Sequence, residues 1–181
     1  DGDFIIDCGA CWGDSTIEFA ASVGDEGKVF AYEFIPRSKE IFQKNIELNP
    51  SLTERIELID NAVWNRSGID VYYKDDGPGS RVEMETFNGY EGTTTTLSID
   101  DLVESYNIRR VDWIKMDIEG AEPTALEGAI KTIKKYRPNL AISIYHNMYD
   151  FSQIAPWLAS LGVGYKFYVR HFTIHAEETI M

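Results

Sequence analysis

Short apolar runs bounded by turn residues alternate along this chain with segments in which apolar residues recur at helical spacing. We expect strands at Phe4–Cys8, Lys28–Glu33, Ile56–Val63, Trp113–Asp117, Leu140–Tyr145, Tyr165–Arg170 and Thr173–Ala176. We expect helices at Ser15–Ser22, Arg37–Leu48, Ile99–Tyr106, Pro123–Lys134 and Phe151–Leu161. Strands that alternate with helices favour βαβ units. The pattern therefore predicts an α/β domain, with a seven-stranded, mostly parallel sheet and helices on both faces.

The last two expected strands are separated only by His171 and Phe172. So short a link permits an antiparallel hairpin and excludes a parallel connection. A parallel sheet that ends in an antiparallel hairpin is unlike the sheet of the usual dinucleotide dehydrogenases. Several helix ends have suitable residues, with Asp14 or Ser15 as a cap for the first helix and Ser98 for the third.

A polar, turn-rich stretch at about 64–97 interrupts the α/β alternation. It is either a surface meander or a lid and wall for a substrate, because long loops on such scaffolds often carry specificity. We expect one domain over residues 1–181. Because a strand-like run follows Asp1-Gly2-Asp3 directly, we expect the chain to be an excerpt that lacks residues upstream.

The chain carries 30 acidic and 17 basic residues, a formal net charge of −13. A surface of this sign repels a phosphate backbone, and the basic residues form no run, so we expect no nucleic-acid partner. No apolar stretch approaches the roughly 20 residues of a membrane span, and no secretory signal begins the chain. We therefore expect a soluble, cytoplasmic protein without a membrane span.

The only cysteines, Cys8 and Cys11, form a Cys-x-x-Cys pattern. Two cysteines make neither a disulfide framework nor a structural zinc site. A thioredoxin-like redox motif is the alternative, since such motifs also lie between a strand and a helix. The neighbouring Gly9 and Gly13 favour a tight turn around a cofactor instead.

The segment Phe4–Thr16 is a hydrophobic strand that leads into a glycine turn and a helix. Asp7 ends the strand, Gly9 permits a sharp turn, and Gly13 permits close approach to the start of the helix. The spacing Asp7-x-Gly9-x-x-x-Gly13 departs from the dinucleotide fingerprint G-x-G-x-x-G. A carboxylate at the turn suits a cationic ligand, and S-adenosylmethionine carries both an ammonium and a sulfonium group.

Two further strand ends carry candidate binding residues. Glu33 ends the second strand, where a carboxylate can bind both ribose hydroxyls of an adenosine, as it would also in NAD. Asn61 and Ala62 follow at the end of the third strand, where they would adjoin a purine ring.

The run Asp112–Glu122 places a lysine and a group of acids at the end of an apolar strand. Helix-dipole effects explain Glu122 at a helix start, but not Lys115 and Asp117 within the strand. Crowded carboxylates favour a bound cation, a cationic ligand or a general base. His146 ends the next strand at the same edge, and it titrates near neutral pH, so we expect it to be a base that deprotonates a substrate hydroxyl.

Together the glycine turn, Tyr32-Glu33-Phe34, the run Ile114–Glu122 and Tyr145-His146 resemble the FkbM-type methyltransferase family over nearly the whole chain. The resemblance implies a Rossmann-like class I methyltransferase fold and S-adenosylmethionine-dependent methylation of hydroxyls in sugars, glycolipids or natural products. By position it implies cofactor contacts from Asp7, Gly9, Ala10, Gly13, Ser15, Thr16, Glu33, Asn61, Ala62 and Asp117. It places Asp117, Glu119 and His146 at the methyl group. Cys8 and Cys11 depart from the family pattern.

Three alternatives remain open from the residues. Asp117 and Asn147 lie at the ends of adjacent strands, like the magnesium ligands of catechol-type O-methyltransferases, and a cation there would lower the pKa of a hydroxyl. A dinucleotide-dependent oxidoreductase would also use the glycine turn and Glu33. A cofactor-binding module without catalysis would keep the same binding residues.

Overall fold

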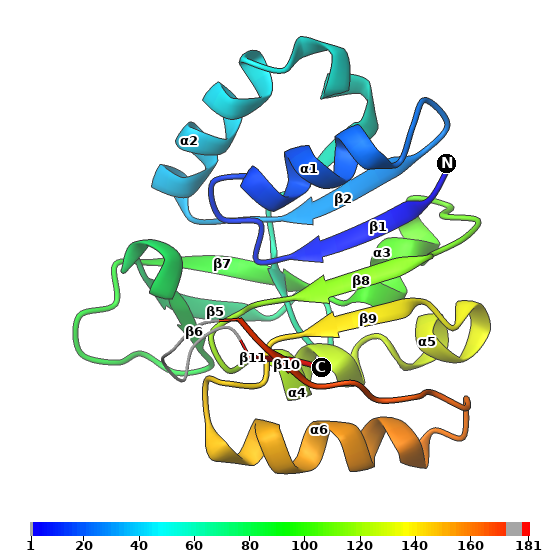
Figure 1. Cartoon of the computed structure of the whole chain (residues 1–181). Coiled ribbons are helices and arrows are strands. Elements are labelled where there is room, and N and C mark those ends of the chain that lie inside the picture. Colours follow the sequence, from blue (N-terminus) through cyan, green and yellow to red (C-terminus); the bar gives the residue numbers. More distant parts are fainter. Residues whose placement is uncertain (1, 173–178) are drawn as a thin grey trace.

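The structure, a computed structural model, describes residues 2–172 and 179–181. Its centre is a sheet of five parallel strands in the order β3-β2-β1-β8-β9 (Figure 1). The strands are β1 (Phe4–Cys8), β2 (Lys28–Tyr32), β3 (Ile56–Ile59), β8 (Trp113–Met116) and β9 (Asn139–Ile142). The order reverses between β1 and β8, because the chain first builds outward to β3 and then returns to add β8 beside β1. Ligands of open α/β sheets bind at such a reversal, at the carboxyl ends of the strands.

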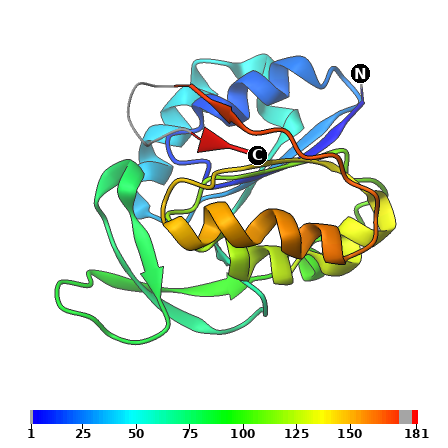
Figure 2. The ribbon, with the colours of Figure 1, turned by 60° about the horizontal axis from the view of Figure 1, so that its bottom comes forward.

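Helices cover both faces of this sheet (Figure 2), as the sequence predicts. The helices are α1 (Asp14–Ser22), α2 (Pro36–Glu47), α3 (Ile99–Ser105), α4 (Glu122–Glu127), α5 (Ile130–Tyr136) and α6 (Met148–Ser160), with the 3-10 turn η1 (Pro50–Arg55). The first two pack on one face, and the others bury the larger core on the opposite face. None of the described helices is long and apolar enough to cross a bilayer.

The sheet has five strands and not the seven that the sequence predicts. The expected strand Ile56–Val63 divides at Asp60 into β3 and a separate β4 (Ala62–Val63), which pairs with a strand of another sheet. Of the expected strand Tyr165–Arg170, only the end is paired, in β10 (Arg170–His171). The expected strand Thr173–Ala176 lies outside the described residues.

An antiparallel hairpin does lie at the carboxyl end of the chain, at a different position from the one predicted. Its strands are β10 and β11 (Thr179–Ile180), which pair antiparallel. The last residues also run antiparallel to the edge after β9, where Ile142 and Met181 exchange both backbone hydrogen bonds at 2.9 Å and Ser143 pairs with Ile180. The chain end thus covers the edge of the parallel sheet.

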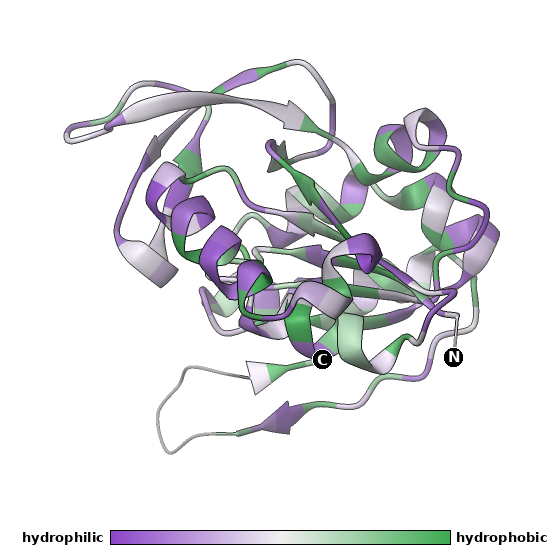
Figure 3. Cartoon of the chain, turned by 90° about the horizontal axis from the view of Figure 1, so that it is seen from above, coloured by the Kyte–Doolittle hydropathy of each residue, from purple (hydrophilic) through white to green (hydrophobic). Residues whose placement is uncertain are grey.

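The polar insertion at 64–97 forms a small sheet of its own, in the order β4-β7-β5-β6. It adds β5 (Asp70–Lys74), β6 (Arg81–Glu83), β7 (Gly92–Leu97) and the 3-10 turn η2 (Gly77–Gly79) to β4. Figure 3 shows this sheet beside the central one, with β7 pale because its threonines are intermediate in hydropathy.

Two expected helices differ clearly from their predicted bounds, and one helix differs in its cap. The expected helix Pro123–Lys134 is interrupted between α4 and α5. At this break Gly128 packs closely on another segment, since a Cβ on it would lie 2.2 Å from the carbonyl oxygen of Trp64. Helix α6 begins at Met148, three residues earlier than predicted, with Asn147 as its cap. Ser98 caps α3 as predicted, but Gly13 occupies the N-cap of α1, and neither Asp14 nor Ser15 caps it.

Candidate active site

A buried ion pair between Asp7 and Lys115 supports the glycine turn after β1. Asp7 is 0% exposed, and its carboxylate accepts hydrogen bonds from Ser15 Oγ at 2.8 Å and Thr16 Oγ1 at 2.7 Å. Lys115 Nζ lies 3.1 Å from Asp7 Oδ1 and donates to the carbonyl of Gly9 at 2.9 Å. Burial alone would lower the pKa of Lys115, but the charge of Asp7 outweighs it and raises this pKa. Asp7 thus contacts Ser15, Thr16 and Lys115, and the expected cofactor contacts of Asp7, Ser15 and Thr16 stay predictions.

Glycine is required at the two positions of the turn for different structural reasons. Both have positive φ, 82° at Gly9 and 83° at Gly13. A Cβ on Gly9 would lie 2.0 Å from the carbonyl oxygen of Asp117, so the turn packs directly on the end of β8. A Cβ on Gly13 would lie 1.8 Å from the ring of Phe42 in α2. Gly13 therefore permits close packing on α2, and the predicted approach of a ligand there stays a prediction.

Replacing Gly9 with alanine tests the contact between the turn and β8. Gly68 is a matched control, because its φ is +76° but a Cβ there would have nothing within 4 Å. Both substitutions force a non-glycine residue into the left-handed region at about 1–2 kcal/mol. We expect G9A to lose about 1–3 kcal/mol more of unfolding free energy than G68A, because the added methyl meets backbone. Urea denaturation measures both, and equal losses would contradict the contact.

A cavity opens at the carboxyl ends of β1, β2 and β8. Five of the predicted cofactor-binding residues line it. They are Gly9, Glu33, Asn61, Ala62 and Asp117, and Glu119 lines it as well. Ala10 is buried against Ala31, Phe42 and Ile46 and supports the turn from within. The other predicted cofactor residues, Asp7, Gly13, Ser15 and Thr16, are not among the lining residues.

Glu33 lies at the inner wall of this cavity and is 7% exposed. Its Oε1 accepts a hydrogen bond from the backbone N–H of Ile35 at 2.7 Å. Burial raises the pKa of Glu33 to about 7, against the lowering effect of the backbone hydrogen bonds. The amide of Asn61 donates to Thr95 of β7, to its Oγ1 at 2.9 Å and its carbonyl at 3.1 Å, which fixes Asn61 to the insertion.

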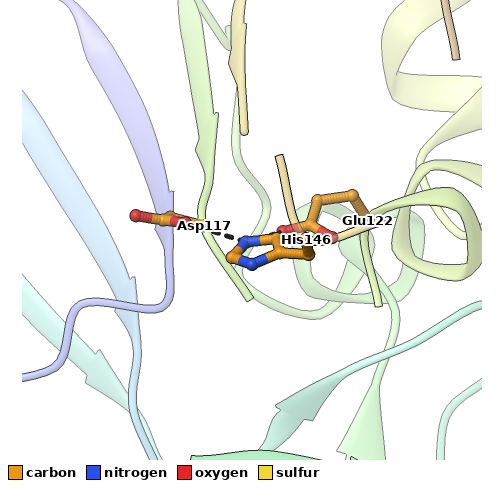
Figure 4. Close-up of side chains that lie close together, drawn as sticks. All are labelled: Asp117, Glu122 and His146. Carbon is orange, nitrogen blue, oxygen red and sulfur yellow. Dashed lines mark hydrogen bonds and ion pairs between the residues drawn. The ribbon is translucent and has the colours of Figure 1, made fainter. Parts of the chain in front are cut away.

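The acidic residues after β8 gather around His146, which follows β9 (Figure 4). His146 Nε2 lies 3.1 Å from both Asp117 Oδ1 and Glu122 Oε1, and Nδ1 lies 3.5 Å from Glu119 Oε2. The hydroxyl of Tyr145 donates to Asp117 Oδ1 at 3.0 Å. The structure thus brings together His146, Asp117 and Glu119, the three predicted catalytic residues.

The protonation of this group depends on its mutual contacts. Burial opposes a charged imidazole, but the hydrogen bonds to Asp117 and Glu122 outweigh it and raise the pKa of His146 to about 10. Burial also opposes charge on Asp117, yet the hydrogen bond from His146 and the charge of Lys115 lower its pKa. Burial raises the pKa of Glu119. These contacts therefore favour the protonated imidazole of His146.

Asn147, which the sequence suggests as a metal ligand together with Asp117, is hydrogen-bonded at the start of α6. Its Oδ1 accepts from the backbone N–H of Asp150 at 2.9 Å, and its Nδ2 donates to Asp150 Oδ2 at 2.6 Å. The amide is thus used as the cap of α6. Among the described residues, the group with metal-ligating spacing is Asp117, Glu122 and His146.

The thiols do not favour redox chemistry. Cys8 and Cys11 are free cysteines, and Cys8 is 0% exposed. Burial raises the pKa of both thiols, that of Cys8 far above its ordinary value. A redox motif requires a low thiol pKa, so the structure opposes the thioredoxin-like alternative.

Several site residues are absent from the sequence-based prediction. The cavity is also lined by Phe34, Ile35 and Val63, and by Gly77, Pro78, Ser80 and Val82 of the insertion. Asp150 contacts the cap Asn147, and the Asn-x-x-Asp spacing at a helix start is a signal that the sequence offered. The residues of the insertion carried no comparable signal, because its fold over the cavity depends on long-range strand pairing.

Solved structures of similar fold are methyltransferases of several kinds. Methyltransferase FkbM from Methylobacillus flagellatus KT aligns with a TM-score of 0.78 and 23% identity, over 99% of this chain and 42% of that one. The chain thus spans less than half of that protein. Fibrillarin from Aeropyrum pernix, in complex with natively bound S-adenosyl-L-methionine, aligns with a TM-score of 0.60 and 13% identity, over 99% of this chain and 65% of that one. A putative rRNA methylase from Clostridium thermocellum aligns with a TM-score of 0.61 and 15% identity, over 99% of this chain and 84% of that one.

These identities establish a methyltransferase-like fold and nothing finer. No curated protein matches the chain. The model of the methyltransferase FkbM domain, by contrast, matches residues 7–167, which include the glycine turn, Glu33, the acidic run after β8 and His146. The chain therefore belongs to the FkbM family of methyltransferases.

Proposed function

We propose that the chain is the catalytic part of an S-adenosylmethionine-dependent O-methyltransferase that acts on a hydroxyl of a sugar, glycolipid or natural product. The observation that carries this proposal is a cavity that joins Glu33 at the end of β2 to Asp117 and Glu119 after β8. The same cavity thus contains the Glu33 carboxylate, which can bind a ribose, and the carboxylates of Asp117 and Glu119, which can face a reacting methyl group. Family membership supports the same cofactor.

In this proposal different lining residues contact different parts of the cofactor. Glu33 accepts hydrogen bonds from the two ribose hydroxyls, and Asn61 and Ala62 adjoin the adenine. The backbone of the turn at Gly9 borders the methionine part. Asp7, Ser15 and Thr16 act beneath this turn, where they fix its shape together with Ala10 and Gly13. Asp117 attracts the sulfonium, because a carboxylate stabilises a nearby cation.

The acceptor enters beside the insertion, whose Pro78, Ser80 and Val82 wall the cavity opposite the turn. The acceptor oxygen attacks the methyl carbon in line, the bond from carbon to sulfur breaks, and S-adenosylhomocysteine leaves. The hydroxyl proton passes to Glu119, which lines the cavity and has a raised pKa. A net charge of −13 favours a small molecule or glycan over a nucleic acid as the acceptor.

Transfer of label from tritiated S-adenosylmethionine tests the proposed reaction. We expect label in hydroxylated sugars or glycolipids and none in rRNA. Thermal-shift measurements with S-adenosylhomocysteine, NAD and NADP run beside it, since a ligand that binds only the folded state raises the melting temperature. Stabilisation by NAD or NADP alone would identify an oxidoreductase. Cofactor binding with no transfer to any acceptor class would identify a binding module without catalysis.

The raised pKa of Glu33 predicts that the affinity for the cofactor depends on pH. Ribose hydroxyls donate to the charged carboxylate, so binding must displace a proton below the pKa of about 7. We expect affinity for S-adenosylmethionine to fall about tenfold from pH 8 to pH 6, as one proton per bound cofactor requires. Glu33→Gln should bind about tenfold more weakly at pH 8 and lose this pH dependence, since a charged hydrogen bond is lost. Calorimetric titration measures both, and an equal slope in the variant would remove Glu33 from the ribose site.

A further inference from the structure

Asp117, Glu122 and His146 converge from three separate segments of the fold. Asp117 follows β8, Glu122 begins α4, and His146 follows β9. Each offers one donor atom, and these three atoms lie within 4.8 Å of one another. Figure 4 shows His146 between Asp117 and Glu122. A group that the topology assembles from distant positions is positioned by the fold and not by local sequence.

Behind this group, two buried carboxylates have oxygen atoms without a hydrogen-bond partner among the described residues. Glu122 is 0% exposed, and its Oε1 accepts from the backbone N–H of Ile118 at 2.8 Å while its Oε2 has no partner. Asp150 is 1% exposed, and its Oδ1 has no partner. The charges of Glu122 and His146 both act on Asp150, so the two carboxylates belong to one electrostatic group.

Within the described part of the chain, this group is short of positive charge. Four carboxylates, Asp117, Glu119, Glu122 and Asp150, surround or adjoin the single imidazole of His146. Lys115, the nearby lysine, is held by Asp7 and the carbonyl of Gly9. A buried carboxylate oxygen without a partner is costly, and buried charges are as a rule paired or bound to metals. The unpartnered oxygen of Glu122 therefore points to a cation in this group.

We propose that Asp117, Glu122 and His146 bind a divalent transition-metal ion such as Mn²⁺ or Zn²⁺. An imidazole nitrogen with two carboxylate oxygens suits these ions, whereas Mg²⁺ prefers a shell of oxygen and water. The ion would replace the proton that His146 shares with Asp117 and Glu122. Asn147 takes no part, because it caps α6.

The ion would also have a place in methyl transfer, and this role rests on the proposed function. Asp117 lines the cavity while Glu122 is buried behind it, so a metal between them would face the acceptor. A hydroxyl bound to a divalent ion is more acidic, which would ease its deprotonation. Binding of the ion itself does not depend on that role.

Mn²⁺ titration of the tag-free, chelator-treated protein, followed by electron paramagnetic resonance, tests the site without cofactor or acceptor. We expect one bound Mn²⁺ per chain, competition by Zn²⁺ and little competition by Mg²⁺. Glu122→Gln and His146→Gln should each weaken Mn²⁺ binding at least about tenfold. The exposed Glu18→Gln on α1 changes the net charge equally and should leave the affinity unchanged.

E122Q is suited to this test because a glutamine oxygen can still accept from Ile118, and circular dichroism checks that each variant is folded. The proposal is overturned if the native protein binds no Mn²⁺ or Zn²⁺ at millimolar concentration, or if folded E122Q binds as well as the native protein. Thermal shift of the metal-free protein by S-adenosylmethionine measures cofactor binding separately. A protein that binds the metal but not the cofactor would refute the proposed function alone.

Discussion

Lys115→Met is expected to lower the unfolding free energy by about 3–5 kcal/mol, the cost of leaving a buried charge without its partner. Asp7 is 0% exposed, and Lys115 Nζ at 3.1 Å is its paired cation. Methionine keeps the length and apolar stem of lysine, so the loss is electrostatic and not a cavity. The hydrogen bond from Lys115 to the carbonyl of Gly9 is lost with it, so the glycine turn loosens as well.

Two further variants separate this explanation from general damage to the sheet. The double variant D7N/K115M removes both charges, and we expect it to recover most of the lost stability, because asparagine can still accept from Ser15 and Thr16. Lys39→Met breaks the surface pair with Asp60, whose side chain is 63% exposed, and should cost at most about 1 kcal/mol. Urea denaturation measures all three. A K115M loss no larger than that of K39M would mean that the buried pair is not what holds the turn.

This ion pair also marks a limit of prediction from the sequence. A carboxylate at a strand end next to a glycine turn suits a cationic cofactor, so the sequence predicts that Asp7 faces one. Asp7 and Lys115 are register partners on the adjacent strands β1 and β8, so their side chains meet on the same face of the sheet. That register joins residues more than a hundred positions apart. The unusual lysine within an apolar strand was the signal, but its partner could be identified only in three dimensions.

The strand Ile56–Val63 shows a different limit. It contains no glycine or proline that would mark a break, so the local pattern alone predicts one strand. The structure ends β3 at Ile59, and Ala62 and Val63 pair instead with Thr96 and Leu97 of the insertion. The partner strand lies more than thirty residues further on, beyond the reach of a local pattern. By contrast β1, β2 and β8 were predicted to within a residue at each end, because buried parallel strands are short apolar runs bounded by polar residues.

The strand ends were the most informative part of the sequence for the site. Glu33, Asp117 and His146 follow three strands of one parallel sheet, and their carboxyl ends meet at one edge. This geometry explains why residues chosen from strand ends lie together in the structure. It does not determine their protonation, which depends on how many carboxylates surround one imidazole. The hydrogen bonds to Asp117 and Glu122 raise the pKa of His146, and its role as a base stays a prediction.

Glu119→Gln is expected to lower the turnover of methyl transfer about 10²–10⁴-fold, the usual contribution of a general base. A proton acceptor in this site must line the cavity and be free of a proton when the acceptor arrives. His146 is not among the lining residues, and its pKa is raised to about 10, which favours Glu119 over it as the acceptor. Asp117 lines the cavity, but its lowered pKa makes it a weak base. Glu119 lines the cavity and has a raised pKa, which makes it the stronger acceptor.

The position of Glu119 allows the base to be separated from the binding of the cofactor. Its backbone is held in the left-handed region, φ 57°, between Asp117 and Gly120, so glutamine keeps the same backbone and side-chain length. We expect E119Q to bind S-adenosylmethionine with an affinity within about threefold of the native protein, since the variant removes a proton acceptor and not a ribose contact. Glu18→Gln, an exposed change of equal charge, should leave turnover unchanged. If E119Q transfers label from tritiated S-adenosylmethionine at the native rate, the proton goes to another acceptor and Glu119 only shapes the wall.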